Sequence, residues 1–395
     1  MKLFEYQAKE LFSRYSIPTP KNMLVENPRR EEEGRKAIPA SAETEKEIAN
    51  ALEKIGTPCA IKAQVLRGGR GKEGLIQLAK SATEAQNAAA DLFSRTEWIR
   101  RLLIEEAVDV EKELYLSITV DPLASEGMII ACREGGVEIE TLAREKPEAV
   151  IKKRFDLTRG LETFRAKATA YDMGLEGDTA KAAAKLLMNL YRIFSDYDCE
   201  LVEINPLFLT KAGDLIAGDA KLMIDDNASF RQKEFERTRE YFDSDTEYQA
   251  AQEGIPYLQF DGNISLMCAG AGLTTTVYDL INYEGGSVAN YLEFGGPNYR
   301  KAKRSMELCL QNPSKVILIV TFGTIARADV MAQGVVEAIE KLQPDRPVVT
   351  CIRGTNEDEA VRTLERAGLE AIFDTEEAVR KAVAIAEGTT EGEKS

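Results

Sequence analysis

The feature that most narrows the possible fold is a regular alternation of short apolar runs and amphipathic segments in the carboxyl-terminal half of the chain. Apolar runs such as 264–269 and 288–292 are each followed by a segment with helical periodicity. Strands that alternate with helices of about 10 to 15 residues form parallel sheets with helices on both faces. The sequence therefore predicts a doubly wound α/β domain. Its other predicted elements are strands 315–321 and 347–353, helices 273–283, 299–311, 329–342 and 357–367, and a last strand and helix within 369–387.

The amino-terminal half mixes strands and helices less regularly up to about Ser244, which indicates a different kind of domain. At about 150 residues per domain, a chain of 395 residues has room for two to three domains. A polar, strongly charged segment over 230–254 is typical of a surface helix and a linker. We therefore expect an amino-terminal domain over 1–245, a linker over 246–260, a doubly wound domain over 261–388 and a tail over 389–395.

The chain contains no histidine. This absence excludes Ser-His-Asp and Cys-His nucleophiles, histidine-ligated zinc and a histidine general base on this chain. The net charge of −15 argues against a surface for nucleic acid or for an anionic membrane, since both need clustered positive charge. Any catalysis must therefore use carboxylates, lysines, backbone amides or a histidine that another protein supplies.

The cellular location is indicated by three sequence features. The six cysteines lie singly in mostly apolar segments without a CxxC pair, which favours buried thiols in a reducing compartment. The first fifteen residues have the pattern of an amphipathic helix rather than that of a signal peptide. No apolar stretch approaches the length that a membrane span needs. We expect a cytoplasmic protein that binds neither membranes nor nucleic acid.

Two glycine-containing turns follow predicted strands of the doubly wound domain. Gly270 and Gly272 follow its first strand, and the turn 322–326 follows its third. In such sheets, ligands bind at the carboxyl ends of the strands, where backbone amides and helix amino termini meet negative groups. Neither turn reads GxGxxG, so a dinucleotide site is not supported. Taken singly, each is equally well explained by glycines that only permit a tight turn.

In the amino-terminal half, Lys62 lies in an apolar strand that leads into a basic, glycine-rich segment over 66–72. Such a lysine and loop can hold a nucleoside triphosphate, with the lysine on the phosphates and loop amides around them. The spacing is not that of a P-loop. Taken alone, a basic surface turn explains the segment better. The acidic segment 103–115 could likewise accept hydrogen bonds from adenine or ribose, although a solvated acidic turn is the simpler interpretation.

A third segment, 201–221, predicts a two-stranded hairpin with its turn at 211–214. Strand alternation places Glu203 and Asn205 on one face, and Asp219 on the returning strand can face them. Oxygen ligands that converge in this way suit Mg²⁺, which takes one or two protein oxygens and completes its shell with phosphate and water. The alternative is an exposed polar face, for which Asn-Pro directly after an apolar strand is an unusual choice.

Together these segments resemble the beta subunits of the succinyl-CoA synthetases, ligases that combine an ATP-grasp domain with a flavodoxin-like CoA-ligase domain. The resemblance runs from end to end through five ordered motifs, at 3–9, 69–72, 134–140, 203–207 and 262–273. It implies an ATP-grasp domain followed by a CoA-ligase domain, with ATP and CoA as substrates and Mg²⁺ as cofactor. Pro20 matches the members that use ATP rather than GTP.

The resemblance also implies a set of site residues. Glu203 falls where the family's beta subunit steadies a phosphohistidine that the alpha subunit presents. The nucleotide would be held by Lys62, Gly69, Arg70, Gly71, Glu105, Val108 and Glu113. Mg²⁺ would be bound by Asn205 and Asp219. The small carboxylic acid would meet the turns at Ala269, Thr324, Ile325 and Ala326.

In this family, the nucleotide phosphorylates a histidine of the alpha subunit, the phosphate passes to a carboxylic acid, and CoA displaces it from the acyl phosphate. CoA is bound mainly by the alpha subunit. The resemblance therefore explains why this chain has no histidine, since the partner supplies it. It implies a CoA-binding alpha subunit as partner, in a heterodimer or a heterotetramer, and an ADP-forming ligase that makes a carbon–sulfur bond.

The sequence departs from the family at the turns that would face the acid. Ala269 stands where succinate-using members have asparagine, Thr324 stands where they have glycine, and the segment 292–298 also differs. Losing a needed hydrogen-bond partner costs about 1 to 3 kcal/mol, enough to change substrate preference by about one or two orders of magnitude. We hypothesise an acid other than succinate, such as malate or citrate. The alternative is that local replacements compensate and succinate remains the substrate.

Two other classes of protein stay open. The first is a stand-alone ATP-grasp ligase that captures an acyl phosphate with an amine, which would leave the complete CoA-ligase-like half unexplained. The second is a non-catalytic subunit that keeps only the fold. The presence of Lys62, Asn205 and Asp219 speaks against that second interpretation.

Overall fold

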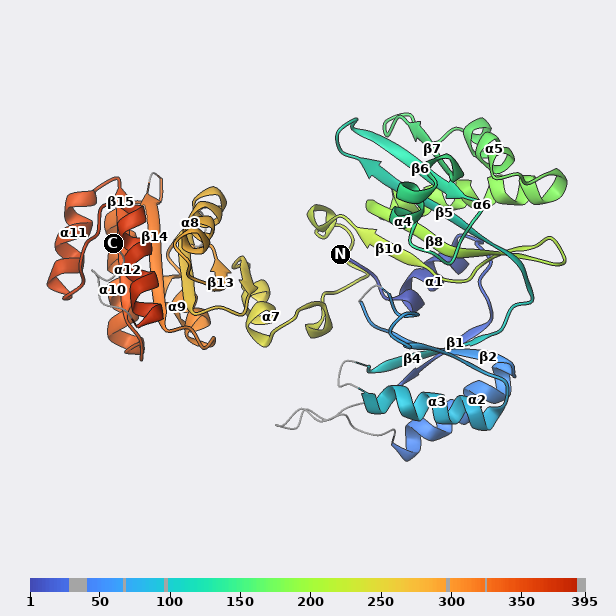
Figure 1. The fold of residues 1–395 in the computed structure, drawn as a ribbon, viewed down its shortest axis with the longest axis horizontal. Coiled ribbons are helices and arrows are strands. Elements are labelled where there is room, and N and C mark those ends of the chain that lie inside the picture. The colour runs from blue at the N-terminus through green and yellow to red at the C-terminus, as the bar shows by residue number, and fades with distance from the viewer. Residues whose placement is uncertain (28–40, 67–68, 96–98, 296–298, 324, 389–395) are drawn as a thin grey trace. The chain divides into compact units, whose positions relative to one another are not determined.

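The computed structural model describes residues 1–27, 41–66, 69–95, 99–295, 299–323 and 325–388. Figure 1 shows two compact units, Met1–Arg237 and Thr238–Ser395. The predicted tail over 389–395 lies outside the described residues, as does Thr324. The division into a linker and two domains at the residues given above stays a prediction.

The first sheet of the amino-terminal unit has the strand order β1-β4-β2-β3, and all its pairings are antiparallel. Two helices, α2 and α3, pack against it around buried residues such as Ile48 and Phe93. The helix α2 begins where the Ser41 side chain accepts a hydrogen bond from the backbone of Thr44. The elements are β1 (Asn22–Glu26), α2 (Ala42–Ile55), β2 (Cys59–Ala63), β3 (Ile76–Ala79), α3 (Ala82–Arg95) and β4 (Arg101–Glu106).

The second sheet of this unit has the order β10-β8-β5-β6-β7, with the short β9 paired to β8. Its long central strands are β5 and β8, which α6 contacts. The strands are β5 (Val110–Asp121), β6 (Glu126–Cys132), β7 (Val150–Phe155), β8 (Cys199–Thr210), β9 (Leu215–Ala217) and β10 (Lys221–Ile224). The helices are α1 (Glu5–Arg14), α4 (Ile139–Glu145), α5 (Thr163–Asp172) and α6 (Gly177–Asp196), with short 3-10 turns at Pro147–Ala149 and Asp226–Ala228.

The β8 strand shows the alternation that the hairpin prediction requires. Val202 and Ile204 are buried, whereas Glu203 and Asn205 are half-buried. The returning chain pairs with β8 in two pieces, β9 and β10, and Asp219 lies between them. The register places Ala217 opposite Leu207 and Lys221 opposite Glu203, so Asp219 comes level with Asn205.

The carboxyl-terminal unit is built on a sheet of order β11-β13-β12-β14-β15. Its strands are β11 (Tyr257–Gln259), β12 (Ile264–Ala269), β13 (Val288–Leu292), β14 (Val316–Gly323) and β15 (Val348–Gly354). The last four pair in parallel, and β11 adds an antiparallel edge. The helices are α7 (Asp245–Gln252), α8 (Ala271–Tyr283), α9 (Ala302–Leu310), α10 (Ala328–Leu342), α11 (Glu357–Arg366) and α12 (Thr375–Glu387), with a 3-10 turn at Arg239–Tyr241.

Helices cover both faces of this sheet, as the alternation predicts. Ile317 and Ile319 of β14 point into a core with α9, α10 and α11, whereas Leu318 and Val320 point into a core with α8 and α12. A strand with two buried faces needs a continuous apolar run, which explains the sequence of β14. The fold prediction is thereby confirmed in the carboxyl-terminal half.

Two details of this half differ from the sequence prediction. The strand expected just after Leu369 is reduced to a single bridge between Ala371 and Thr350. The edge strand β11 was not predicted, because three residues carry too little periodicity to be recognised.

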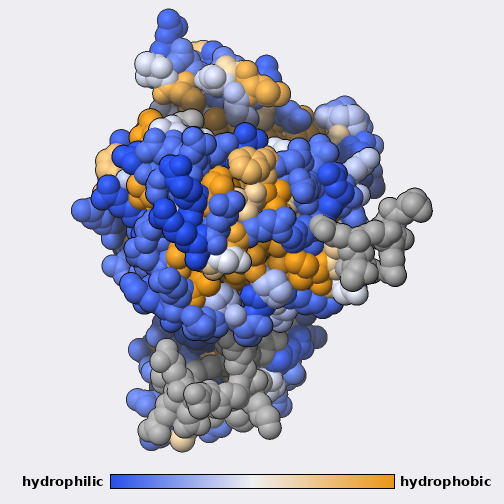
Figure 2. All heavy atoms as spheres, turned by 90° about the vertical axis from the view of Figure 1, so that its left-hand side faces the viewer, coloured by the Kyte–Doolittle hydropathy of each residue, from blue (hydrophilic) through white to orange (hydrophobic). Residues whose placement is uncertain are grey.

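The surface agrees with the charged composition. Figure 2 shows one face of the molecule, which is mainly hydrophilic with a group of hydrophobic residues near its middle. Within the described residues, no helix is both long and apolar enough to cross a membrane. All six cysteines are buried free thiols, as predicted.

Candidate functional site

A cavity of about 1030 Å³ opens in the amino-terminal unit. It is lined by the glycine-rich loop after β2, the segment around α4, the middle of β8 and the chain between β9 and β10. The size suits a ligand as large as a nucleotide. Six of the residues singled out in the sequence line it, namely Gly69, Arg70, Gly71, Glu203, Asn205 and Asp219.

Four other predicted nucleotide residues do not line this cavity. Lys62 and Glu105 lie in a buried charged cluster that also contains Glu5, a lining residue. Val108 is half-buried in the connection between β4 and β5. Glu113 is exposed on β5, and its carboxylate packs so closely against Gly136 that a Cβ there would lie 2.1 Å from Glu113 Oε2.

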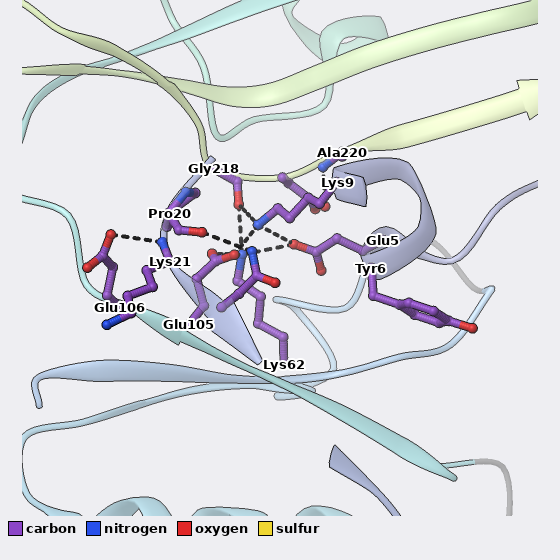
Figure 3. A network of polar contacts seen from close by, with 12 residues as sticks. Glu5, Tyr6, Lys9, Pro20, Lys21, Lys62, Glu105, Glu106, Gly218 and Ala220 are labelled. Atoms are coloured by element: carbon purple, nitrogen blue, oxygen red, sulfur yellow. Dashed lines mark hydrogen bonds and ion pairs between the residues drawn. The ribbon is translucent and has the colours of Figure 1, made fainter. Parts of the chain in front are cut away.

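The buried charged cluster joins α1, β2 and β4 (Figure 3). The Lys62 ammonium lies 3.0 Å from Glu5 Oε1 and 2.6 Å from Glu105 Oε1, and it donates to the Gly218 carbonyl oxygen at 2.7 Å. Lys9 contacts the same two carboxylates and donates to the same carbonyl at 2.9 Å. These four charged residues are between 2% and 7% exposed.

The neighbouring charges in this cluster favour the ionised forms of Glu5 and Lys62. Burial alone would raise the pKa of the Glu5 carboxyl, but Lys62, Lys9 and Arg70 hold that pKa well below its usual range. Burial alone would lower the pKa of Lys62, but Glu5 and Glu105 raise it above its usual range. Removing one partner of such a buried network typically costs about 3 to 5 kcal/mol of stability.

Arg70 connects this cluster to the predicted metal ligand Asp219. Its guanidinium lies 2.5 Å from Glu5 Oε2 and donates to both carboxylate oxygens of Asp219 at 2.8 Å. Both of these hydrogen bonds to Asp219 come from one guanidinium nitrogen, while the other terminal nitrogen contacts Glu5, so Arg70 bridges the two carboxylates through charge-assisted hydrogen bonds. Both oxygens of the Asp219 carboxylate therefore accept hydrogen bonds from Arg70 in this structure.

Asn205 is fixed by the loop that follows β6. Its side-chain oxygen accepts from the Gly136 backbone N–H at 2.8 Å, and its side-chain nitrogen donates to the Val137 carbonyl at 3.0 Å. The Gly218 N–H donates to the Pro206 carbonyl, which holds the returning chain beside β8. An amide oxygen and a carboxylate that line one cavity from adjacent segments fit the donor preference of Mg²⁺.

Glu203 lies on the same face of β8, beside the predicted metal ligands. Its carboxylate accepts a hydrogen bond from the Tyr115 hydroxyl at 2.9 Å, and Lys221 lies opposite it on β10. Burial raises the pKa of Glu203, although Lys221 and the hydrogen bond from Tyr115 act in the opposite direction. A half-buried carboxylate held in this way can accept a hydrogen bond from an imidazole N–H.

The predicted acid-binding residues lie in the carboxyl-terminal unit, at the carboxyl edge of its sheet. Ala269 ends β12 and pairs with Thr321 of β14, so the two turns that follow are adjacent. The third divergent segment lies against the first of these turns, because a Cβ on Gly295 would lie 3.0 Å from the Ala269 Cα. Ile325 is 98% exposed, and Ala326 packs on the core of α9 and α10.

Comparison with known proteins identifies the family. A family model for the ATP-grasp domain matches residues 2–209, and one for the CoA-ligase domain matches residues 267–385. The succinate–CoA ligase [ADP-forming] subunit beta of Ignicoccus hospitalis is 39% identical over 98% of this chain and 99% of its own length. The chain is a beta-type subunit of the ADP-forming acid-CoA ligase family. The resemblance seen in the sequence motifs is thereby confirmed.

Relatives with higher identity in this family carry another name. An ADP-forming sulfoacetate-CoA ligase subunit of Acholeplasma sp is 58% identical over 98% of this chain and 92% of its own length. The corresponding subunit of Bilophila wadsworthia is 56% identical over 98% of this chain and its own entire length. A solved structure of ATP citrate lyase from Methanothrix soehngenii has a TM-score of 0.73 at 22% identity, covering 98% and 99% of the two chains, and shares the fold.

Sequence reasoning about this family member missed the residues that hold the predicted ones in place. Glu5 and Lys9 belong to the opening motif but received no role, because charged residues four apart on a helix are usually a solvated pair. Tyr115 and Gly218 were also missed. Their contacts with Glu203 and Lys62 join segments that are far apart in the sequence, so no local sequence pattern indicates them.

Proposed function

We propose that this chain is the nucleotide-activating subunit of an ADP-forming ligase that joins sulfoacetate to CoA. Its partner would be a CoA-binding subunit that carries the phosphorylated histidine. The observation that carries the choice of acid is the clustering of the three divergent turns, around Ala269, Gly295 and Gly323, at one sheet edge. The higher identity to sulfoacetate-CoA ligase subunits than to the succinate-CoA ligase subunit named above supports the same acid.

The chemistry of that edge supports a sulfonate. A sulfonate is tetrahedral and carries one negative charge over three oxygens, so it resembles a phosphate more than a planar carboxylate. Anions of this kind bind at helix amino termini, where the first N–H groups have no partner within the helix. The helix α8 begins at this edge after Gly270, and among the described residues no side chain caps it. Alanine at position 269 leaves more space there than the asparagine of succinate-using members.

The amino-terminal unit would activate the nucleotide. Lys62 and Arg70 would neutralise its phosphates, and the backbone of Gly69–Gly71 would close over them. Asn205 and Asp219 would hold Mg²⁺, which neutralises phosphate charge when it is bound. The terminal phosphoryl group of ATP would pass to the partner's histidine and leave ADP. Glu203, positioned by the hydrogen bond from Tyr115, would hold that histidine in place. Its carboxylate would accept a hydrogen bond from the ring nitrogen of the histidine that does not carry the phosphate.

The partner's phosphohistidine would then give its phosphate to the acid carboxylate. The CoA thiolate would attack the resulting acyl phosphate, form the carbon–sulfur bond and release inorganic phosphate. In this scheme the carboxyl-terminal unit contributes to binding of the acid, and this chain needs no histidine of its own.

A panel of acids tests the choice of substrate. With the cognate partner, ATP and CoA, we expect kcat/KM for sulfoacetate to exceed that for succinate by about ten- to a hundredfold. Malate and citrate are expected to be used no better than succinate. The variant Ala269→Asn should shift this preference towards succinate. Equal or better use of succinate, malate or citrate by the natural chain would show that sulfoacetate is the wrong acid.

A further inference from the structure

Two lysines in the buried charged cluster contact the same acceptor groups. Lys9 and Lys62 both contact Glu5 Oε1, one oxygen each of Glu105, and the carbonyl oxygen of Gly218. Figure 3 shows that the two ammonium groups reach these acceptors from two different elements, Lys9 from α1 and Lys62 from β2. Each ammonium group by itself bridges the two carboxylates, so either lysine could keep both carboxylates in contact with a cation if the other one moved away.

The cluster is neutral when it is counted together with Arg70 and Asp219. The cations Lys9, Lys62 and Arg70 face the anions Glu5, Glu105 and Asp219. A nucleoside triphosphate that attracts Lys62 and Arg70 would take two positive charges away from these buried carboxylates. A buried carboxylate without a cation is strongly unfavourable, so binding would be opposed unless another cation stayed behind.

The position of Lys9 makes it the cation that would remain beside Glu5 and Glu105 when a nucleotide binds. Its side chain is 1% exposed, and that of Lys62 is 9% exposed. Lys9 is anchored on α1, one turn after Glu5, so its ammonium group stays beside that carboxylate as long as the helix is formed. Lys62 stands on β2, directly before the glycine-rich loop that lines the cavity.

We propose that Lys9 is a positioning residue of the nucleotide site, which stays with Glu5 and Glu105 and thereby releases Lys62 to the phosphates. This inference rests on the proposed function, in that it needs a nucleotide in the cavity. Lys9 touches neither the cavity nor the reacting atoms, and acts through the two carboxylates that it neutralises. In the same way, Glu5 competes with the nucleotide for Lys62 and Arg70.

Calorimetry with Mg-ATP on the full chain together with its partner tests this role. In Lys9→Met, Lys62 becomes the remaining ammonium group for two buried carboxylates. We therefore expect Mg-ATP binding to weaken about tenfold, the size of coupling found between neighbouring charges in one network. The KM for ATP should rise by a similar factor, with kcat changed less than about twofold. The control Lys181→Met removes an exposed helix lysine paired with Asp178 and should bind as the natural chain does.

A compensating variant separates this role from a merely structural one. In Lys9→Met/Glu5→Gln, the cluster regains its charge balance, and Mg-ATP affinity should recover to within about threefold of the natural chain. Glu5→Gln alone should bind Mg-ATP more tightly, because one competitor for Lys62 and Arg70 is gone. A structural role predicts weaker or unchanged binding instead. Should Lys9→Met fail to fold, Glu5→Gln decides the question by the sign of its effect.

The outcomes distinguish this inference from the proposed function. If the natural chain binds Mg-ATP and Lys9→Met binds it equally well, the role of Lys9 is wrong and the proposed function stands. Weaker or unchanged binding by Glu5→Gln, or no recovery in the double variant, also overturns the role of Lys9. If the natural chain does not bind Mg-ATP at all, both the function and this inference are wrong.

Discussion

Replacing Lys62 by methionine is expected to lower ATP-dependent thioester formation by about a hundred- to a thousandfold, the usual effect of removing one preorganised charge-stabilising group. Methionine keeps the length of the side chain and removes its charge. Lys9 still contacts Glu5 and Glu105 in this variant, and Arg70 still contacts Glu5, so neither carboxylate is left without a cation while the phosphates lose one. Steady-state rates with the cognate partner, together with thermal unfolding, measure the two effects separately.

The matched control for this prediction is Lys153→Met. Lys153 is also a strand lysine in an ion pair, 2.5 Å from Asp172, but that partner does not line the cavity, whereas Glu5, a partner of Lys62, does. It should change the rate less than about twofold. Full activity of Lys62→Met would contradict the assignment of this lysine to the phosphates.

Replacing Asp219 by asparagine is expected to have a comparably large effect on the response to Mg²⁺. The change removes the carboxylate of the proposed metal pair and leaves Asn205 with a neutral partner. We expect the Mg²⁺ concentration needed for half-maximal ATP binding to rise by about a hundredfold, since each lost charge-assisted ligand costs several kcal/mol in a partly buried site. Calorimetric titrations of ATP at a series of Mg²⁺ concentrations measure this shift.

The chain offers a close control for that substitution. Asp198 also pairs with an arginine, Arg231, through both carboxylate oxygens, and it has a similar exposure to Asp219. It does not line the cavity. Asp198→Asn should leave the Mg²⁺ dependence unchanged, and an equal shift in both variants would show that Asp219 does not act as a metal ligand.

The doubly wound half of the fold could be predicted because its signals are local. Each of the parallel strands, such as β14, is largely apolar, and each is followed by a helix. The hairpin around Asn205 could be predicted for the same reason, since alternation within one strand determines which side chains share a face. Each signal of this kind is contained in a short stretch of sequence.

The charged cluster could not be predicted, because its members come from separate segments. Glu5 and Lys9 have the pattern of a solvated helix pair, yet both are buried. The pairing of Arg70 with Asp219 joins residues 149 positions apart. No periodicity links such residues, so their assembly depends on how α1 and the two sheets pack. Reasoning from single segments therefore singled out Lys62, Glu105, Arg70 and Asp219, but neither Glu5 and Lys9 nor the contacts that join these residues.

The most direct test of the central claim follows the terminal phosphate of ATP. The chain with its cognate partner is incubated with Mg²⁺ and ATP labelled in that phosphate, and the two subunits are then separated under denaturing alkaline conditions, which preserve phosphohistidine. The label is expected on the partner subunit and not on this chain, which has no histidine to accept it. Label bound covalently to this chain, or none on the partner, would contradict the proposed division of the reaction between two subunits.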